Sequence, residues 1–110
     1  MITITERAAE EIKLSTQNPD TQGLQMRFAV EKTDTEFRYL MGFDQRADSD
    51  IHLRSNGVEY VFAYAQKELL SGMVVDFDEI SVEGGYGFIF MNPNDPNYEP
   101  PAEKLAPDKN

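Results

Sequence analysis

The sequence predicts a mostly β fold of the α+β class, with one helix near the N-terminus and a second short helix further along. Three observations support this prediction. Several stretches alternate apolar and polar residues, as strands with one buried face do, and an Asn-Gly pair separates two of them. Residues 6–15 instead place small apolar side chains at helical spacing.

The N-terminal residues predict a short strand that leads into the first helix. Ile2 and Ile4 alternate with threonines, and the helix is expected over residues 6–15. Thr5 suits the N-cap, because its hydroxyl can accept a hydrogen bond from a backbone N–H that has no partner inside the helix. The apolar face of this helix is expected to lie on a sheet, and its members are Ala8, Ala9 and Ile12.

Two hairpins are expected in the middle of the chain. Residues 24–30 and 37–43 each alternate apolar and polar side chains, and the polar connection 32–36 is short enough for a hairpin. A charged loop over residues 44–50 precedes the second hairpin. There Asn56-Gly57 lies between two alternating stretches, and both residues tolerate the positive φ that a type I′ turn requires.

The C-terminal half predicts a helix and two strands. The second helix is expected from about Ala65 to Leu70, with Gly72 in a left-handed conformation at its end. Residues 73–77 are expected to form a strand. After a glycine-rich turn at residues 84–87, the apolar run 88–91 predicts a strand that is covered on both faces, and Pro93 ends it.

Length and composition indicate one domain. The chain has 110 residues, of which 40% are hydrophobic. Residues 1–94 are expected to form the core domain, and the acidic, Pro-rich residues 95–110 a flexible tail. No apolar run approaches the ~20 residues of a membrane helix, and the N-terminus lacks the pattern of a secretion signal. The expected location is therefore the cytoplasm.

The chain is strongly acidic. Its formal net charge is -10, and residues 95–110 contribute four acidic and two basic side chains, which leaves -8 on the core domain. Such a body repels nucleic acid and anionic membranes, whose non-specific binding depends on Lys and Arg. Basic protein surfaces and cations remain open as partners, as does the simpler explanation that the excess acid keeps the protein soluble.

The sequence excludes several kinds of chemistry. With no cysteine, it has no disulfide, no thiolate ligand and no thiol nucleophile. His52 is the only histidine, so an ordinary zinc site or a Ser-His-Asp triad has little support, and His52 is expected to be a simple outward-facing residue. The glycine run 84–87 precedes a strand and lacks the Lys-Ser/Thr ending of a phosphate loop. We assign no catalytic, cofactor-binding or metal-ligating residue, and we expect that the protein is not an enzyme.

Acidic loop residues offer one route to cation binding. Asp34 and Glu36 lie in the first hairpin connection and could, together with Glu99 from the tail, hold an iron, magnesium or calcium ion. Hard cations prefer oxygen ligands but usually need several converging carboxylates on an ordered scaffold. Solvated loop acids are the simpler explanation.

A second acidic run follows the second helix. Asp76 and Asp78 alternate with apolar residues and should share one face of a strand, and Glu79 and Glu83 extend the run. This stripe could meet a basic partner. A solvated sheet face is the more common arrangement.

Several short sequences occur in a specific order along residues 2–94. They are residues 2–9, 24–30 and 39–43, Gly57-Val58, Leu69-Leu70-Ser71-Gly72 with Val75-Asp76-Phe77, and Gly87-Phe88 through Asn92-Pro93-Asn94. Each is weak alone, but together they resemble the HesB/IscA-like family, the A-type iron-sulfur cluster carriers. The resemblance implies two small sheets packed as a sandwich or partial barrel, with the N-terminal helix against them.

The resemblance also shows what this chain lacks. It places one ligand cysteine near Asp34, and a Cys-Gly-Cys near Glu99-Pro100-Pro101, but no cysteine is present. Cluster iron binds soft thiolates, and carboxylates lack a comparable affinity for it. The resemblance thus implies a cysteine-free homologue, a non-enzymatic accessory or adaptor protein linked to iron-sulfur cluster biogenesis that cannot ligate a cluster itself. Protein partners, including iron-sulfur assembly components, and a homo-oligomer fit this hypothesis, and the alternative is a carboxylate-based iron or divalent metal-ion binding protein.

Overall fold

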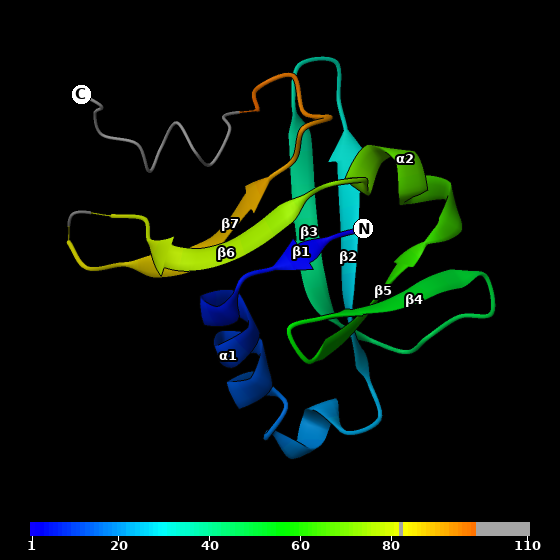
Figure 1. Ribbon diagram of the computed structural model, residues 1–110, viewed down its shortest axis with the longest axis vertical. Coiled ribbons are helices and arrows are strands. Elements are labelled where there is room, and N and C mark those ends of the chain that lie inside the picture. Colours follow the sequence, from blue (N-terminus) through cyan, green and yellow to red (C-terminus); the bar gives the residue numbers. More distant parts are fainter. Residues whose placement is uncertain (82, 99–110) are drawn as a thin grey trace.

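The computed structural model describes residues 1–81 and 83–98 (Figure 1). In chain order its elements are β1 (Thr3–Ile4), α1 (Glu6–Ser15), the 3-10 turn η1 (Pro19–Thr21), β2 (Gln25–Lys32), β3 (Phe37–Asp44), β4 (Asp50–Ser55), β5 (Val58–Ala63), the 3-10 turn η2 (Tyr64–Gln66), α2 (Lys67–Leu70), β6 (Val74–Glu79) and β7 (Tyr86–Met91). No helix in these residues is long and apolar enough to cross a membrane.

Within this part of the chain the strands form two sheets. The four-stranded sheet has the order β3-β2-β5-β4, in which the two hairpins are joined by the parallel pair β2–β5. The three-stranded sheet has the order β1-β6-β7, and its β1–β6 pair is also parallel. Neither sheet closes into a barrel. The predicted mostly β, α+β fold with two sheets and two helices is confirmed.

One hydrophobic core lies where the sheets and α1 meet. Tyr60 at its centre is 1% exposed, and its hydroxyl accepts a 3.0 Å hydrogen bond from the Ile2 amide and donates one of 3.2 Å to the Ile2 carbonyl. These bonds satisfy a polar group that would otherwise be costly to bury. The predicted inner face of α1 is confirmed, since Ala8, Ala9 and Ile12 are all buried.

The local signals in the sequence form the expected turns and caps. The Thr5 hydroxyl accepts a 3.2 Å hydrogen bond from the Ala8 amide at the start of α1. Asn56 has φ 48° and Gly57 has φ 81°, and they join β4 to β5 in an antiparallel pair. Gly72 has φ 81° just after α2. These positions follow predictions made from residue type alone.

One prediction about the last strand is wrong. β7 does form, but it is not covered on both faces: Tyr86 is exposed, and residues 87–91 are only half-buried. The reason is its position, because β7 lies at the edge of the smaller sheet and pairs with β6 alone. In Figure 1 the β6–β7 pair extends away from the larger sheet, and α1 lies below it.

Candidate functional site

The turn between β2 and β3 lies beside the segment that follows β7. The Tyr39 hydroxyl donates a 2.6 Å hydrogen bond to the Asp95 carboxylate, and Asn97 Nδ2 lies 3.5 Å from the Thr35 carbonyl oxygen. The Tyr39 ring also stacks on Phe90, with 5.0 Å between centroids. Figure 1 shows this segment, in orange, beside the tip of the β2–β3 hairpin. The fold therefore brings together two loops that are far apart in the sequence.

Asn92 and Asn94 hold this segment against the end of α2. The Asn92 side chain is 1% exposed and donates a 2.8 Å hydrogen bond to the Leu69 carbonyl. Asn94 Nδ2 donates to the Ser71 carbonyl at 2.9 Å, and its backbone amide donates to Asn92 Oδ1 at 2.9 Å. In the sequence, Pro93 predicts the end of a strand and Asn92-Pro93-Asn94 contributes to the family resemblance, but neither predicts this clamp. A polar residue on each side of that proline was the available signal.

Tyr39 is a hydrogen-bond donor in the neutral form. Burial raises the pKa of its hydroxyl well above the ordinary value, and the neighbouring Asp95 carboxylate raises this pKa further. The hydroxyl consequently keeps its proton at neutral pH. It ties the chain after β7 to β3 and is not poised to act as a base.

The carboxylates proposed from the sequence do not converge with others in the described residues. Asp34 and Glu36 are exposed, and Glu36 lies 3.6 Å from the exposed guanidinium of Arg38. The turn itself is held by Thr33, whose amide donates a 2.8 Å hydrogen bond to the Glu36 carbonyl. Glu99 lies outside the described residues. Within residues 1–81 and 83–98 no three His, Asp or Glu side chains are close enough to hold a metal ion.

The second acidic run is not simply solvated, so that prediction is wrong for its first member. Asp76 is 15% exposed in its side chain, and it accepts hydrogen bonds of 2.6 Å from the Thr5 hydroxyl and from Arg7. Arg7 also pairs with Asp78 at 3.1 Å. Burial raises the pKa of Asp76, but the hydrogen bonds from Thr5, the Phe77 amide and Arg7 together outweigh burial and lower it. The basic partner of this stripe is the chain's own first helix.

His52 lies on the outer face of β4, in a group of charged side chains. Its Nε2 is 3.1 Å from Glu59, and its Nδ1 is 2.9 Å from Arg46. Arg54 also donates a 2.8 Å hydrogen bond to Glu59, and this bond, followed by the His52 bond, lowers the pKa of Glu59. The group is a chain of surface hydrogen bonds that includes one ion pair, Arg54–Glu59, and it has only one acidic member, so it does not provide a metal site.

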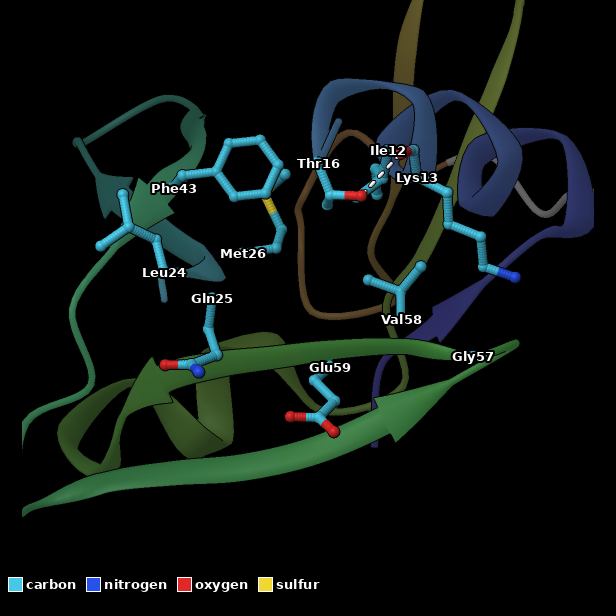
Figure 2. Close-up of a pocket in the computed structure, with 10 residues that line it drawn as sticks. All are labelled: Ile12, Lys13, Thr16, Leu24, Gln25, Met26, Phe43, Gly57, Val58 and Glu59. Carbon is cyan, nitrogen blue, oxygen red and sulfur yellow. Dashed lines mark hydrogen bonds between the residues drawn. The ribbon is translucent and has the colours of Figure 1, made fainter. Parts of the chain in front are cut away.

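A pocket of about 290 Å³ lies between the end of α1, the start of β2 and the β4–β5 turn (Figure 2). Its apolar lining includes Ile12, Met26 and Phe43. Its charged members do not converge, since in Figure 2 the Lys13 amine and the Glu59 carboxylate point in different directions. The Thr16 hydroxyl donates to the Lys13 carbonyl at 2.6 Å. No nucleophile and base meet in this pocket.

A family model described as Iron-sulphur cluster biosynthesis matches residues 1–98, which include all of the described residues. The chain belongs to this family. The predicted HesB/IscA-like resemblance is therefore confirmed. No curated protein is significantly similar to the chain in sequence.

Three solved structures share the fold of this chain. IscA with a [2Fe-2S] cluster is 27% identical, with a TM-score of 0.70 and 86% of each chain covered. A protein from Aquifex aeolicus is 29% identical, with a TM-score of 0.60, over 84% of this chain and 91% of that one. Escherichia coli SufA, at 24% identity, has a TM-score of 0.65 over 84% and 86%, and shows likeness of fold alone.

The side chains of this family member do not fit an iron-sulfur cluster. Tyr39 and Asn97 bring the β2–β3 turn together with the segment that follows β7. The resemblance places one ligand cysteine in that turn, near Asp34, and the others near residues 99–101, which lie outside the described residues. The 110-residue sequence contains no cysteine. Iron in these clusters takes thiolates, with histidine as the usual substitute, and the only histidine lies on β4.

Proposed function

We propose that this iron-sulfur family member is a non-enzymatic adaptor protein in cluster biogenesis that does not ligate a cluster itself. Its contribution would be its surface, through contacts with proteins of the assembly process. The proposal includes a cytoplasmic location, which is the expectation from the sequence pattern, and a capacity to self-associate, which the family resemblance implies.

One observation carries this proposal. The fold retains the junction between the β2–β3 turn and the segment after β7, including the buried Asn92, but supplies no thiolate there. A carboxylate at Asp34 is a hard ligand and cannot replace sulfur on cluster iron. A scaffold that persists without its ligands is best explained by selection for its shape and surface.

Anaerobic reconstitution with iron and sulfide tests the proposal that the protein does not ligate a cluster. The purified, untagged protein should be colourless after desalting and contain no stoichiometric labile sulfide. A brown protein with stoichiometric sulfide and iron would overturn it. Affinity purification of the chain from its native cells tests the adaptor role: enrichment of iron-sulfur assembly proteins supports an adaptor, and their absence contradicts one.

The alternative function, binding of iron or another divalent ion through carboxylates, gains no specific support from the described residues, because no three ligands converge there. Calorimetric titration with iron(II), magnesium and calcium separates the two functions. An adaptor should give only a weak heat that modest salt removes. A stoichiometric, salt-resistant site would favour the alternative.

A further inference from the structure

A groove of about 400 Å³ lies between α1 and the β6–β7 pair, away from the junction described above. On the helix side it is lined by Leu14 and by the charged residues Arg7, Glu10 and Glu11, and on the sheet side by Phe77, Asp78 and Tyr86. The position follows from the fold, since β6 and β7 extend past the larger sheet and α1 runs below them (Figure 1).

The floor of the groove is an aromatic row at the edge of the core, in which Phe77 and Phe88 pack against the core and Tyr86 is exposed. Cross-strand register places Glu79 opposite Tyr86 and Phe77 opposite Phe88 on the same sheet face. Phe77 contacts Phe88 at 5.0 Å and stacks on Tyr86 at 6.0 Å between ring centroids. Tyr86 is 62% exposed, and Leu14 across the groove is 60% exposed. Large apolar side chains gathered around one hollow are typical of a contact surface.

The rim of the groove is acidic. Three of its lining side chains are acids and one, Arg7, is basic, and Arg7 is already paired with Asp76 and Asp78. Exposed Glu79 adds a further negative charge at the end of β6. The net charge of the whole chain, -10, reinforces this local field. Such a field attracts cationic segments and speeds their encounter.

From this geometry and charge we propose that the α1/β6–β7 groove docks a basic segment of a partner protein, with an apolar side chain of that segment resting on Phe77 and Tyr86. This inference rests on the proposed adaptor function and names its docking surface. A second copy of this chain suits this acidic groove poorly, because its own net charge is also -10, so we expect self-association to use another surface. Anionic lipid and nucleic acid are disfavoured for the same reason.

Chemical-shift mapping with a model ligand tests the proposal on the intact 12.5 kDa protein. The probe is a short synthetic peptide of leucine and lysine with leucines at helical spacing, and the comparison peptide carries glutamate in place of lysine. The lysine peptide should shift the amide resonances around Leu14, Phe77 and Tyr86, and its binding should weaken as the salt concentration rises. The glutamate peptide should not bind there.

Two matched pairs of variants make the test specific. Tyr86→Ser removes the exposed ring of the groove, and Tyr64→Ser removes a ring of similar exposure, 65%, on η2. Glu10→Gln removes one rim charge, and Glu68→Gln removes a charge from α2. Tyr86→Ser should weaken peptide binding about fivefold or more, as truncation of an aromatic anchor does, whereas Tyr64→Ser should not.

The proposal is overturned if both peptides bind equally, if the shifts map elsewhere, or if Tyr86→Ser and Tyr64→Ser behave alike. It is also overturned if the same amides shift with protein concentration alone while sedimentation shows a dimer, since the occupant is then a second copy. The iron and sulfide test is independent of the groove. If the protein stays colourless but the groove binds no lysine peptide, only this inference is rejected. If the protein is brown and the groove does bind the lysine peptide, only the proposed lack of a cluster is rejected.

Discussion

Tyr39 and Asp95, 56 positions apart in the sequence, are joined by a 2.6 Å hydrogen bond from the phenol to the carboxylate. This bond fixes the chain after β7 against β3. Its neighbours are Phe90, stacked on the same ring, and Asn97, which reaches the turn before β3. The residues just after β7 are thus bound to β3 through Tyr39 and to the β2–β3 turn through Asn97.

Removing the Tyr39 hydroxyl should weaken this attachment. Tyr39→Phe keeps the ring and its stacking but leaves the Asp95 carboxylate without its donor, so the free energy of unfolding should fall by about 1 kcal/mol. Urea unfolding measures this change. Tyr64→Phe is the control, because Tyr64 is 65% exposed, and its value should stay within about 0.5 kcal/mol of wild type. Equal effects at both positions would contradict the assigned role.

Gly72 should tolerate no side chain. It has φ 81°, and a Cβ built on it would lie 3.2 Å from Pro93 Cγ in the Asn92–Asn94 clamp. Gly72→Ala should therefore destabilise the protein by about 1–3 kcal/mol through backbone strain and crowding. Gly42→Ala in β3 is the matched control, since a Cβ there meets no atom within 4 Å. The thermal midpoint of Gly42→Ala should equal or exceed that of wild type.

The sequence predicts features formed by neighbouring residues and misses those formed by residues that are distant along the chain. Asn56-Gly57 and Thr5 act on neighbouring residues, so residue type was enough to predict the turn and the cap. The parallel pairs β2–β5 and β1–β6 join strands that are distant in the sequence, and no local pattern specifies them. The order of short sequences supplied that information through the family resemblance.

Contacts between side chains that are distant in the sequence could not be predicted either. The pattern at Asp76 shows which face it occupies but not that Arg7 and Thr5 lie opposite. In the same way, an apolar run at residues 88–91 does not reveal whether its strand lies at an edge. The candidate site was predictable only as two positions in the sequence, near Asp34 and near Glu99, and Glu99 lies outside the described residues. The clamp at Asn92, which holds the segment after β7, was not predicted.

The ion pair between Arg27 and Asp50 should make stability depend on acid pH. Asp50 has a side chain that is 3% exposed, and it accepts hydrogen bonds from Arg27, including one of 2.9 Å, and one of 2.7 Å from the Ala47 amide. The Arg27 hydrogen bond lowers the pKa of Asp50, the Ala47 amide lowers it further, and together they outweigh burial. A lowered folded pKa means that this stabilisation is complete above the unfolded pKa of about 4 and is lost as pH falls through the folded value.

Asp50→Asn should therefore reduce stability at neutral pH and flatten its decline below about pH 4. Urea midpoints measured from neutral to strongly acidic pH should approach those of wild type at the acid end. Asp48→Asn, at an exposed position in the same loop, should keep the wild-type pH profile. Parallel curves for wild type and Asp50→Asn would show that Asp50 is not responsible for the acid dependence.

Restoring thiolates should restore cluster binding if the scaffold is intact. The variant Asp34→Cys, Glu99→Cys, Pro100→Gly, Pro101→Cys returns cysteines to the positions that the resemblance assigns. The first lies in the β2–β3 turn, and the others follow in sequence the segment that the Tyr39–Asp95 bond holds. After anaerobic reconstitution it should be brown and contain labile sulfide, because the soft ligands that iron requires are then present. The control places three cysteines at the exposed positions Asp20, Asp48 and Glu68, which lie on separate elements, and it should remain colourless. A folded but colourless restored variant would mean that the junction has diverged in shape as well as in its ligands.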